Sequence, residues 1–107
     1  MPNPLSTMKK NGVYTILTPD ESFLIGHSDG QPVAFFFSQK KKATAYRTLI
    51  GKADHLIIKE DAQALTQELV DVGVKEAFVD PEDVKNLPDP LFLPKYLEHL
   101  SKEAAAT

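Results

Sequence analysis

The sequence predicts an α/β protein of the α+β kind, with helices packed on a mixed five-stranded sheet. In the first third of the chain, short turns separate three apolar runs, which is typical of an antiparallel meander. After Ser38, helical and strand patterns alternate, which is typical of parallel strands joined by right-handed helical crossovers. The expected order is therefore strand, strand, strand, helix, strand, helix, strand, helix.

The three strands of the meander are expected at residues 13–17, 22–26 and 31–37. The first is β-branched and aromatic, as strands prefer. Pro19 and Asp20 favour a turn after it, and Gly30 supplies the positive φ that a tight second turn needs.

The third strand is expected to run directly into a helix. Ser38 is the expected N-cap, because its hydroxyl can accept from free N–H groups of the first turn. Ala43, Tyr46, Leu49 and Ile50 then form one apolar helical face. Gly51 fits the left-handed residue that ends a helix.

The remaining elements follow the same rules. A strand is expected at 54–59, where the unbroken run 56–58 predicts burial on both faces, as in a parallel sheet. The helix 61–72 has an acidic start and Gly73 as its stop. A strand at 75–79 ends at Asp80-Pro81, residues 87–94 are irregular, and Pro94 opens a last helix reaching about 103.

Length and composition bound the function. A chain of 107 residues favours one domain, expected at 13–103 between a flexible leader (1–12) and a frayed tail (104–107). A net charge of −3 gives no general attraction to nucleic acid or anionic lipid. No apolar run approaches the roughly 20 residues that span a bilayer, and the absence of cysteine excludes thiolate chemistry. The default expectation is a cytoplasmic protein without a cofactor.

The lysine run is the first candidate binding site. Lys40, Lys41 and Lys42 stand in the first turn of the expected helix, where cations oppose its positive pole. Together with Ser38 and the free N–H groups they can receive an anion such as phosphate. The alternative is a solvated charged face, and the loop lacks the glycines of a P-loop.

Aromatic side chains are the second candidate. Three successive phenylalanines, 35–37, require cover on both faces of their strand. That cover comes either from the helices or from a second subunit. Phe36, Phe92 and Tyr96 are the candidate interface residues, and closure of the core is the alternative.

Nothing in the sequence specifies an enzyme. His27, His55 and His99 fall on separate elements without the spacing of a metal site, so no metal is expected. Acidic residues gather at strand ends, where open α/β sheets bind ligands. Capping is the preferred explanation of these residues, because Asp61 and Asp80 precede helical turns. Carboxylate catalysis would need one cleft joining Asp54, Glu60 and Asp80.

One family resembles this arrangement. A hairpin leads to Phe36-Phe37-Ser38, an Ala43-bearing helix follows, and a later strand closes on Val79-Asp80-Pro81. Over residues 13–83 this resembles the N-terminal domain of the SseB family, in which a strand ending Phe-x-Ser enters a helix and a later strand closes on Asn-Pro or Asp-Pro. The chain departs from the family in having no tryptophan, and no second domain is expected in it. The resemblance implies the topology, and it carries over no catalytic residue.

The sequence therefore favours a small, non-enzymatic protein that binds another protein, or itself as a homodimer, in an accessory or regulatory role. The alternative is a small-anion binder that uses Ser38 and Lys40–Lys42.

Overall fold

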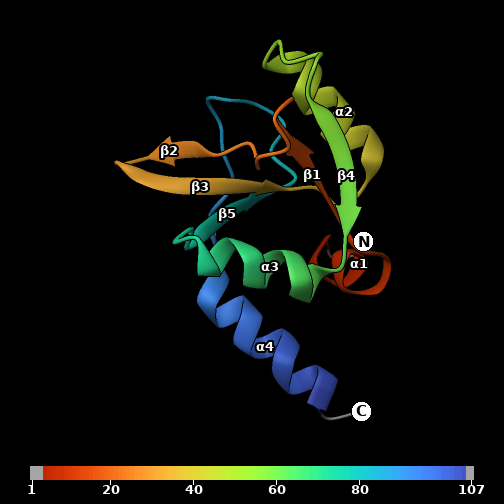
Figure 1. The fold of residues 1–107 in the computed structure, drawn as a ribbon, viewed down its shortest axis with the longest axis vertical. Helices are drawn as coiled ribbons and strands as arrows, with labels where there is room; N and C mark the ends of the chain where they lie inside the picture. Colours follow the sequence, from red (N-terminus) through yellow and green to blue (C-terminus); the bar gives the residue numbers. More distant parts are fainter. Residues whose placement is uncertain (1–3, 106–107) are drawn as a thin grey trace.

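The computed structural model describes residues 4–105 and confirms a mixed α+β fold (Figure 1). Its strands form two sheets, so the single five-stranded sheet expected from the sequence is wrong. The larger sheet has the order β2-β3-β5-β6 and the smaller one pairs β1 with β4. The strands are β1 (Val13–Leu17), β2 (Gly26–Ser28), β3 (Gln31–Phe36), β4 (Leu56–Glu60), β5 (Glu76–Val79) and β6 (Leu91–Phe92).

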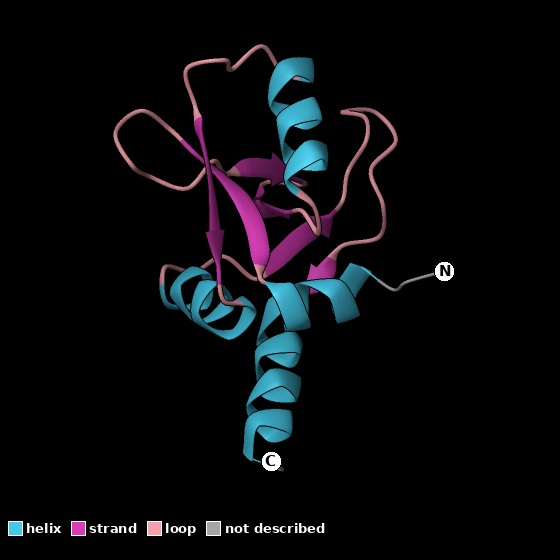
Figure 2. Cartoon of the chain, turned by 90° about the vertical axis from the view of Figure 1, so that its right-hand side faces the viewer, coloured by secondary structure: helices cyan, strands magenta, loops and turns pink. Residues whose placement is uncertain are grey.

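Helices cover the larger sheet from both sides. They are α1 (Pro4–Asn11), α2 (Lys40–Leu49), α3 (Ala62–Asp71) and α4 (Leu93–Ala105). Figure 2 shows α2 on one side of the strands and the other three helices on the opposite side. Among the residues described, no helix has the length and apolarity needed to cross a bilayer.

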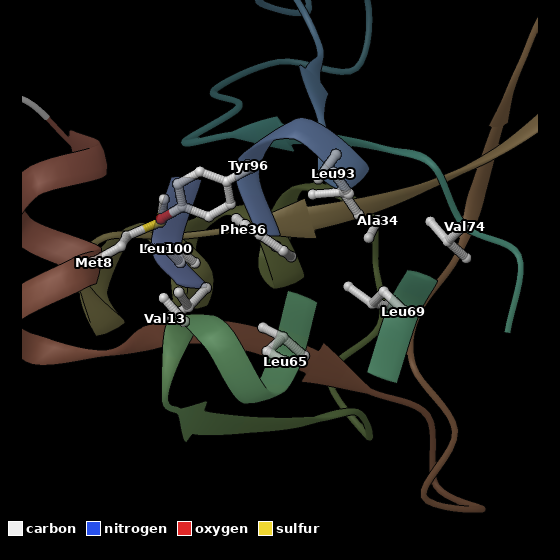
Figure 3. Packing of buried hydrophobic residues seen from close by; sticks show 12 residues of the cluster. Met8, Val13, Ala34, Phe36, Leu65, Leu69, Val74, Leu93, Tyr96 and Leu100 are labelled. Carbon is white, nitrogen blue, oxygen red and sulfur yellow. The ribbon is translucent and has the colours of Figure 1, made fainter. Parts of the chain in front are cut away.

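The core is correspondingly divided by β3. Ala34 and Phe36 pack with α1, α3 and α4, including the side chains that Figure 3 shows around Leu65 and Tyr96. Phe35 and Phe37 point to the other side and pack against α2. The prediction that this strand needs cover on both faces is therefore confirmed, and the cover comes from the chain itself.

β4 is the main correction to the topology. The run 56–58 predicted a strand buried on both faces beside parallel neighbours, but β4 pairs antiparallel with β1. Leu56 is 51% exposed, so the apolar run belongs to a strand at the edge of a sheet. The expected parallel relation holds between β3 and β5, which pair directly.

The N-terminal segment is a second correction. Composition predicted a flexible leader at 1–12, but residues 4–11 form α1, and Met8 has no exposed surface. The helix docks because Leu5 and Met8, three residues apart, both face the core. Gly12 ends it at φ +94°. Residues 1–3 of the expected leader and residues 106–107 of the expected tail lie outside the described part. The helix α4 extends to Ala105.

The structure contains the expected helix caps and stops, but it differs from the expected local structure at two segments. Asp61 caps α3 as expected, with its carboxylate accepting from Ala64 N at 3.2 Å. Gly51 and Gly73 have the positive φ predicted for helix ends. The expected strand 22–26 is irregular apart from one bridge at Phe23, and its place is taken by β2. The irregular stretch before α4 contains the two-residue β6.

Candidate functional site

The candidate site lies where the parallel strands β3 and β5 end side by side. The peptide N–H of Asp80, directly after β5, donates to the carbonyl of Phe36 at 2.8 Å and extends the pairing by one residue. Ser38 follows β3 at the same end of the sheet. The carboxyl ends of neighbouring parallel strands are where ligands bind in open α/β sheets.

The side chain of Asp80 ties the two strand ends together. One carboxylate oxygen, Oδ1, accepts from the peptide N–H of Ser38 at 2.7 Å. The other, Oδ2, accepts from the Ser38 hydroxyl at 2.7 Å and from Lys42 Nζ at 3.3 Å. The Asp80 side chain is only 9% exposed. Hydrogen bonds to an ionised acceptor are roughly twice as strong as neutral ones. We call this set of contacts, in which Asp80 binds Ser38 and Lys42, the anchor.

Asp80 holds an unusual backbone conformation in this anchor. Its φ is +52°, in the left-handed region. This region costs most L-residues about 1–2 kcal/mol, and Asp and Asn tolerate it best because their short side chains bond locally. The conformation turns the chain sharply after β5, where its carboxylate meets Ser38.

The anchor explains how α2 begins. Ser38 was the expected N-cap, but the N-cap is Gln39, whose side chain makes no cap hydrogen bond. Ser38 is one residue too early, and its hydroxyl donates to Asp80 instead. No acidic residue lies in the first turn of α2. The negative charge that complements its positive pole comes from Asp80, 40 residues away in sequence from Lys40.

Beside the anchor lies an open groove of about 430 Å³ between α2 and the chain after β5. We call this the α2 groove. It is lined by Lys41, Lys42, Ala45, Tyr46, Leu49, Asp80, Pro81 and Glu82. Leu49 is 51% exposed, and Pro81 is buried beneath the surface of the groove. The lining is thus mainly apolar, with the two lysines at one end and Glu82 on the other wall.

Tyr46 forms a rigid part of this lining. Its ring packs between those of Phe35 and Phe37, with centroids 5.3 and 5.6 Å away. Burial raises the pKa of Tyr46, and the negative charge of Asp83 raises it further. The hydroxyl is therefore protonated at neutral pH and offers a donor. An aromatic side chain held by two others suits a surface for binding.

A second hollow, of about 490 Å³, adjoins the α2 groove through Asp80 and Glu82. Its lining comes from the irregular segment after β5 and includes Lys85, Asn86, Leu87 and Pro88. Leu87 is exposed here, as is Val84 nearby in sequence. Leu87 therefore adds an exposed apolar side chain to the surface beside the α2 groove.

The predicted anion-binding residues are divided by the structure. Ser38 and Lys42 are already bonded to Asp80. Lys41 lines the α2 groove, and Lys40 is exposed outside it. Within the described part, Lys41 has no ion pair.

The predicted interface residues are also divided. Phe36 has no exposed surface and Tyr96 is 6% exposed, so both lie in the core of this chain. Only Phe92 reaches the surface, at 47% exposed, because β6 lies at the edge of the larger sheet. The spacing of aromatic residues could not distinguish these two environments.

The other titratable candidates do not converge. Asp54 bonds to the neighbouring His55, and burial raises the pKa of Glu60 on β4, with repulsion from Glu68 as a second cause. Only Asp80, of the three carboxylates considered for catalysis, lines the α2 groove. Within residues 4–105 no three acidic or histidine side chains lie close enough to hold a metal ion.

The contact that sequence reasoning missed is the one between Ser38 and Asp80. The sequence places both residues at strand ends, but it predicts that Asp80 caps a turn of its own segment. The usable signal was the predicted parallel relation, which brings the residues after β3 and β5 together. Comparison with known proteins finds no matching family model and no matching curated protein.

Proposed function

We propose that the protein is a non-enzymatic binding protein that holds a segment of a partner protein in the α2 groove. The observation that carries the proposal is the contrast between two sets of side chains. The side chains that could act in catalysis are bonded to one another, because Asp80 accepts hydrogen bonds from both Ser38 and Lys42. In contrast, two of the apolar side chains that line the groove, Ala45 and Leu49, are exposed.

The state of Ser38 supports binding over catalysis. A serine nucleophile needs a base and an open approach to its hydroxyl. The Ser38 hydroxyl does contact a carboxylate, but the residue is only 6% exposed. The same carboxylate also accepts from the Ser38 peptide and from Lys42. The Ser38 hydroxyl is therefore buried against a carboxylate that already has three donors, and it has no open approach for a substrate.

The charges of the groove indicate what kind of segment fits. Lys41 and the uncapped N–H groups of α2 favour a carboxylate at one end. Tyr46, Leu49 and Pro81 favour a neighbouring apolar side chain. Glu82 on the opposite wall repels a second acidic group. The preferred segment therefore carries one acidic residue followed by apolar ones. A formal net charge of −3 also favours protein over nucleic acid.

Selection from a random peptide display library tests this proposal. We expect the selected peptides to combine an acidic residue with apolar ones. Leu49→Asp and Lys41→Glu should each weaken their binding by about tenfold or more, which is 1.4 kcal/mol. Val72→Asp and Lys75→Glu are matched controls at exposed positions outside the groove. Equal losses in both pairs of variants would show that the peptides bind elsewhere.

A small anion is the second candidate ligand, favoured by the absence of a side-chain cap on α2. Because Ser38 and Lys42 are already bonded to Asp80, binding of such an anion would depend on Lys40 and Lys41. Titration with inorganic phosphate, followed by NMR, distinguishes the two candidates. Shifts confined to residues 39–42 and abolished by Lys41→Glu, with unchanged stability, would favour the anion.

Two further expectations remain part of the proposal. One is a cytoplasmic location, which cell fractionation tests. The other is kinship with SseB-type N-terminal domains. The two motifs that carry that resemblance, Phe36-Phe37-Ser38 and Val79-Asp80-Pro81, meet at the anchor beside the groove. This supports a shared framework for the site and assigns no activity to it.

A further inference from the structure

The outer edge of β4 carries peptide groups that no strand pairs. On β1, Tyr14 exchanges both backbone hydrogen bonds with Phe37, and Ile16 O accepts from Leu24 N. These groups therefore point away from β4. Because hydrogen-bonded and non-bonded pairs alternate in an antiparallel ladder, β4 must reach β1 through residues 56, 58 and 60. The peptide groups of Ile57 and Lys59 consequently face outward.

No hydrogen bond reaches these outward peptides in the described part of the chain. Neither Ile57 nor Lys59 takes part in any backbone hydrogen bond outside the ladder, and no side chain bonds to their peptides. β4 has five residues, against three in β2 and two in β6, the edges of the larger sheet. It is the longest free edge of the two sheets, and Leu56 on it is half exposed. Such an edge is a template for another strand.

We propose that β4 pairs antiparallel with β4 of a second copy, about a twofold axis at Ile58. This surface is separate from the α2 groove. In this register Ile57 lies opposite the partner's Lys59 and exchanges two backbone hydrogen bonds with it, and symmetry repeats the exchange. All the outward peptide groups of both strands are then bonded. The two-stranded sheets of the copies join into one continuous sheet.

The charges along the strand select this register over its neighbours. A twofold at Lys59 would place the two lysines directly opposite each other. A twofold at Ile57 would place Glu60 opposite the Asp54 position of the second copy. Like charges directly opposite are destabilising. The register centred on Ile58 avoids both like-charge pairs. It places Ile58 opposite Ile58 of the second copy, and Leu56 opposite Glu60 of the second copy.

The size of the contact predicts a weak dimer. Two five-residue edges make a contact smaller than that of a stable dimer. We therefore expect a dissociation constant on the order of 0.1 mM. Sedimentation velocity from about 10 μM to about 1 mM should show a monomer becoming a dimer.

A pair of charge variants tests the register itself. Leu56→Lys places an ammonium opposite Glu60 of the second copy and should tighten the dimer several-fold. Leu56→Glu places two carboxylates there and should weaken it by a similar factor. Both effects should shrink in high salt. Leu56 is 51% exposed, so both variants should keep the fold, which circular dichroism checks.

Cysteine variants give a second, geometric test, because the chain has no cysteine of its own. Opposed residues in a non-hydrogen-bonded antiparallel pair have Cα atoms about 4.5 Å apart, within reach of a disulfide. Ile58→Cys should therefore cross-link rapidly under mild oxidation. Leu56→Cys, on the same strand but not opposite itself, should not.

Three results would overturn the proposal. The first is a monomer at all concentrations. The second is a dimer whose dissociation constant is the same in Leu56→Lys and Leu56→Glu. The third is equal cross-linking of both cysteine variants. Binding of peptides to the α2 groove is measured separately, so failure of either idea leaves the other standing.

Discussion

Replacing Asp80 with alanine should cost the protein much of its stability. The change removes a charged acceptor from the peptide N–H and hydroxyl of Ser38, a residue only 6% exposed. Each such bond contributes about 1.5–3 kcal/mol. The contact with Lys42 adds less than about 1 kcal/mol, because Lys42 is 37% exposed. Alanine at φ +52° adds about 1–2 kcal/mol of strain.

These contributions share one site and do not add fully, since water can enter the space left by the carboxylate. We expect Asp80→Ala to lower the free energy of unfolding by about 4 kcal/mol. A domain of this size is stable by about 5–15 kcal/mol. The loss corresponds to a fall in Tm of about 20 °C. Urea unfolding, with an unchanged slope, measures it directly.

Two companion variants separate the sources of the loss. Asp80→Gly removes the same hydrogen bonds but relieves the backbone strain, so it should be more stable than Asp80→Ala by about 1 kcal/mol. Asp80→Asn keeps the shape and one acceptor and should lose about 1–2 kcal/mol. Glu82→Ala, at an exposed neighbour, should change stability by less than about 0.5 kcal/mol. A loss below about 1 kcal/mol for Asp80→Ala would refute the anchor.

Two more predictions concern the core and the pH dependence of stability. Met8→Ala should lower the free energy of unfolding by about 2–4 kcal/mol in the same urea assay, because Met8 has no exposed surface; no change would mean that α1 does not dock. Burial raises the pKa of Glu60 from 4.5 on folding, so ionised Glu60 opposes folding, and its contribution is more favourable at low pH. Glu60→Gln should therefore be more stable than the natural protein at pH 7, with the advantage vanishing as the pH falls below about 4.5 in a pH series of thermal melts; an advantage that grows with acid would contradict this.

Local chemistry made three of the four described helices and most strands readable from sequence. Asp61, Gly51 and Gly73 are cap and stop signals that depend on nearby backbone groups alone. The three successive phenylalanines 35–37, at the end of β3 and directly after it, predicted cover on both faces because side chains alternate along a strand. These inferences succeeded because each physical cause lies within a few residues of its effect.

The pairing of β4 was not readable in the same way. An apolar run such as 56–58 fits a strand covered on both sides, but it also fits a strand at an edge. The choice depends on whether β4 or β5 lies beside β3, and those alternatives differ in contacts between residues far apart in sequence. Met8 was missed for a related reason. Prolines and polar residues dominate the composition of its segment, while only one face of α1 meets the core.

The anchor and the α2 groove depend on one contact, which limits how the proposed function can be tested. Asp80 bonds to Ser38 just before α2 begins, and its own turn leads into Pro81 at the base of the groove. A variant at Asp80 would therefore change the shape of the groove and the stability of the fold together. Leu49 and Lys41 line the groove from exposed positions of α2 and take no part in the anchor. Loss of binding in variants of these two residues, at unchanged stability, is thus the evidence that would assign binding to the groove itself.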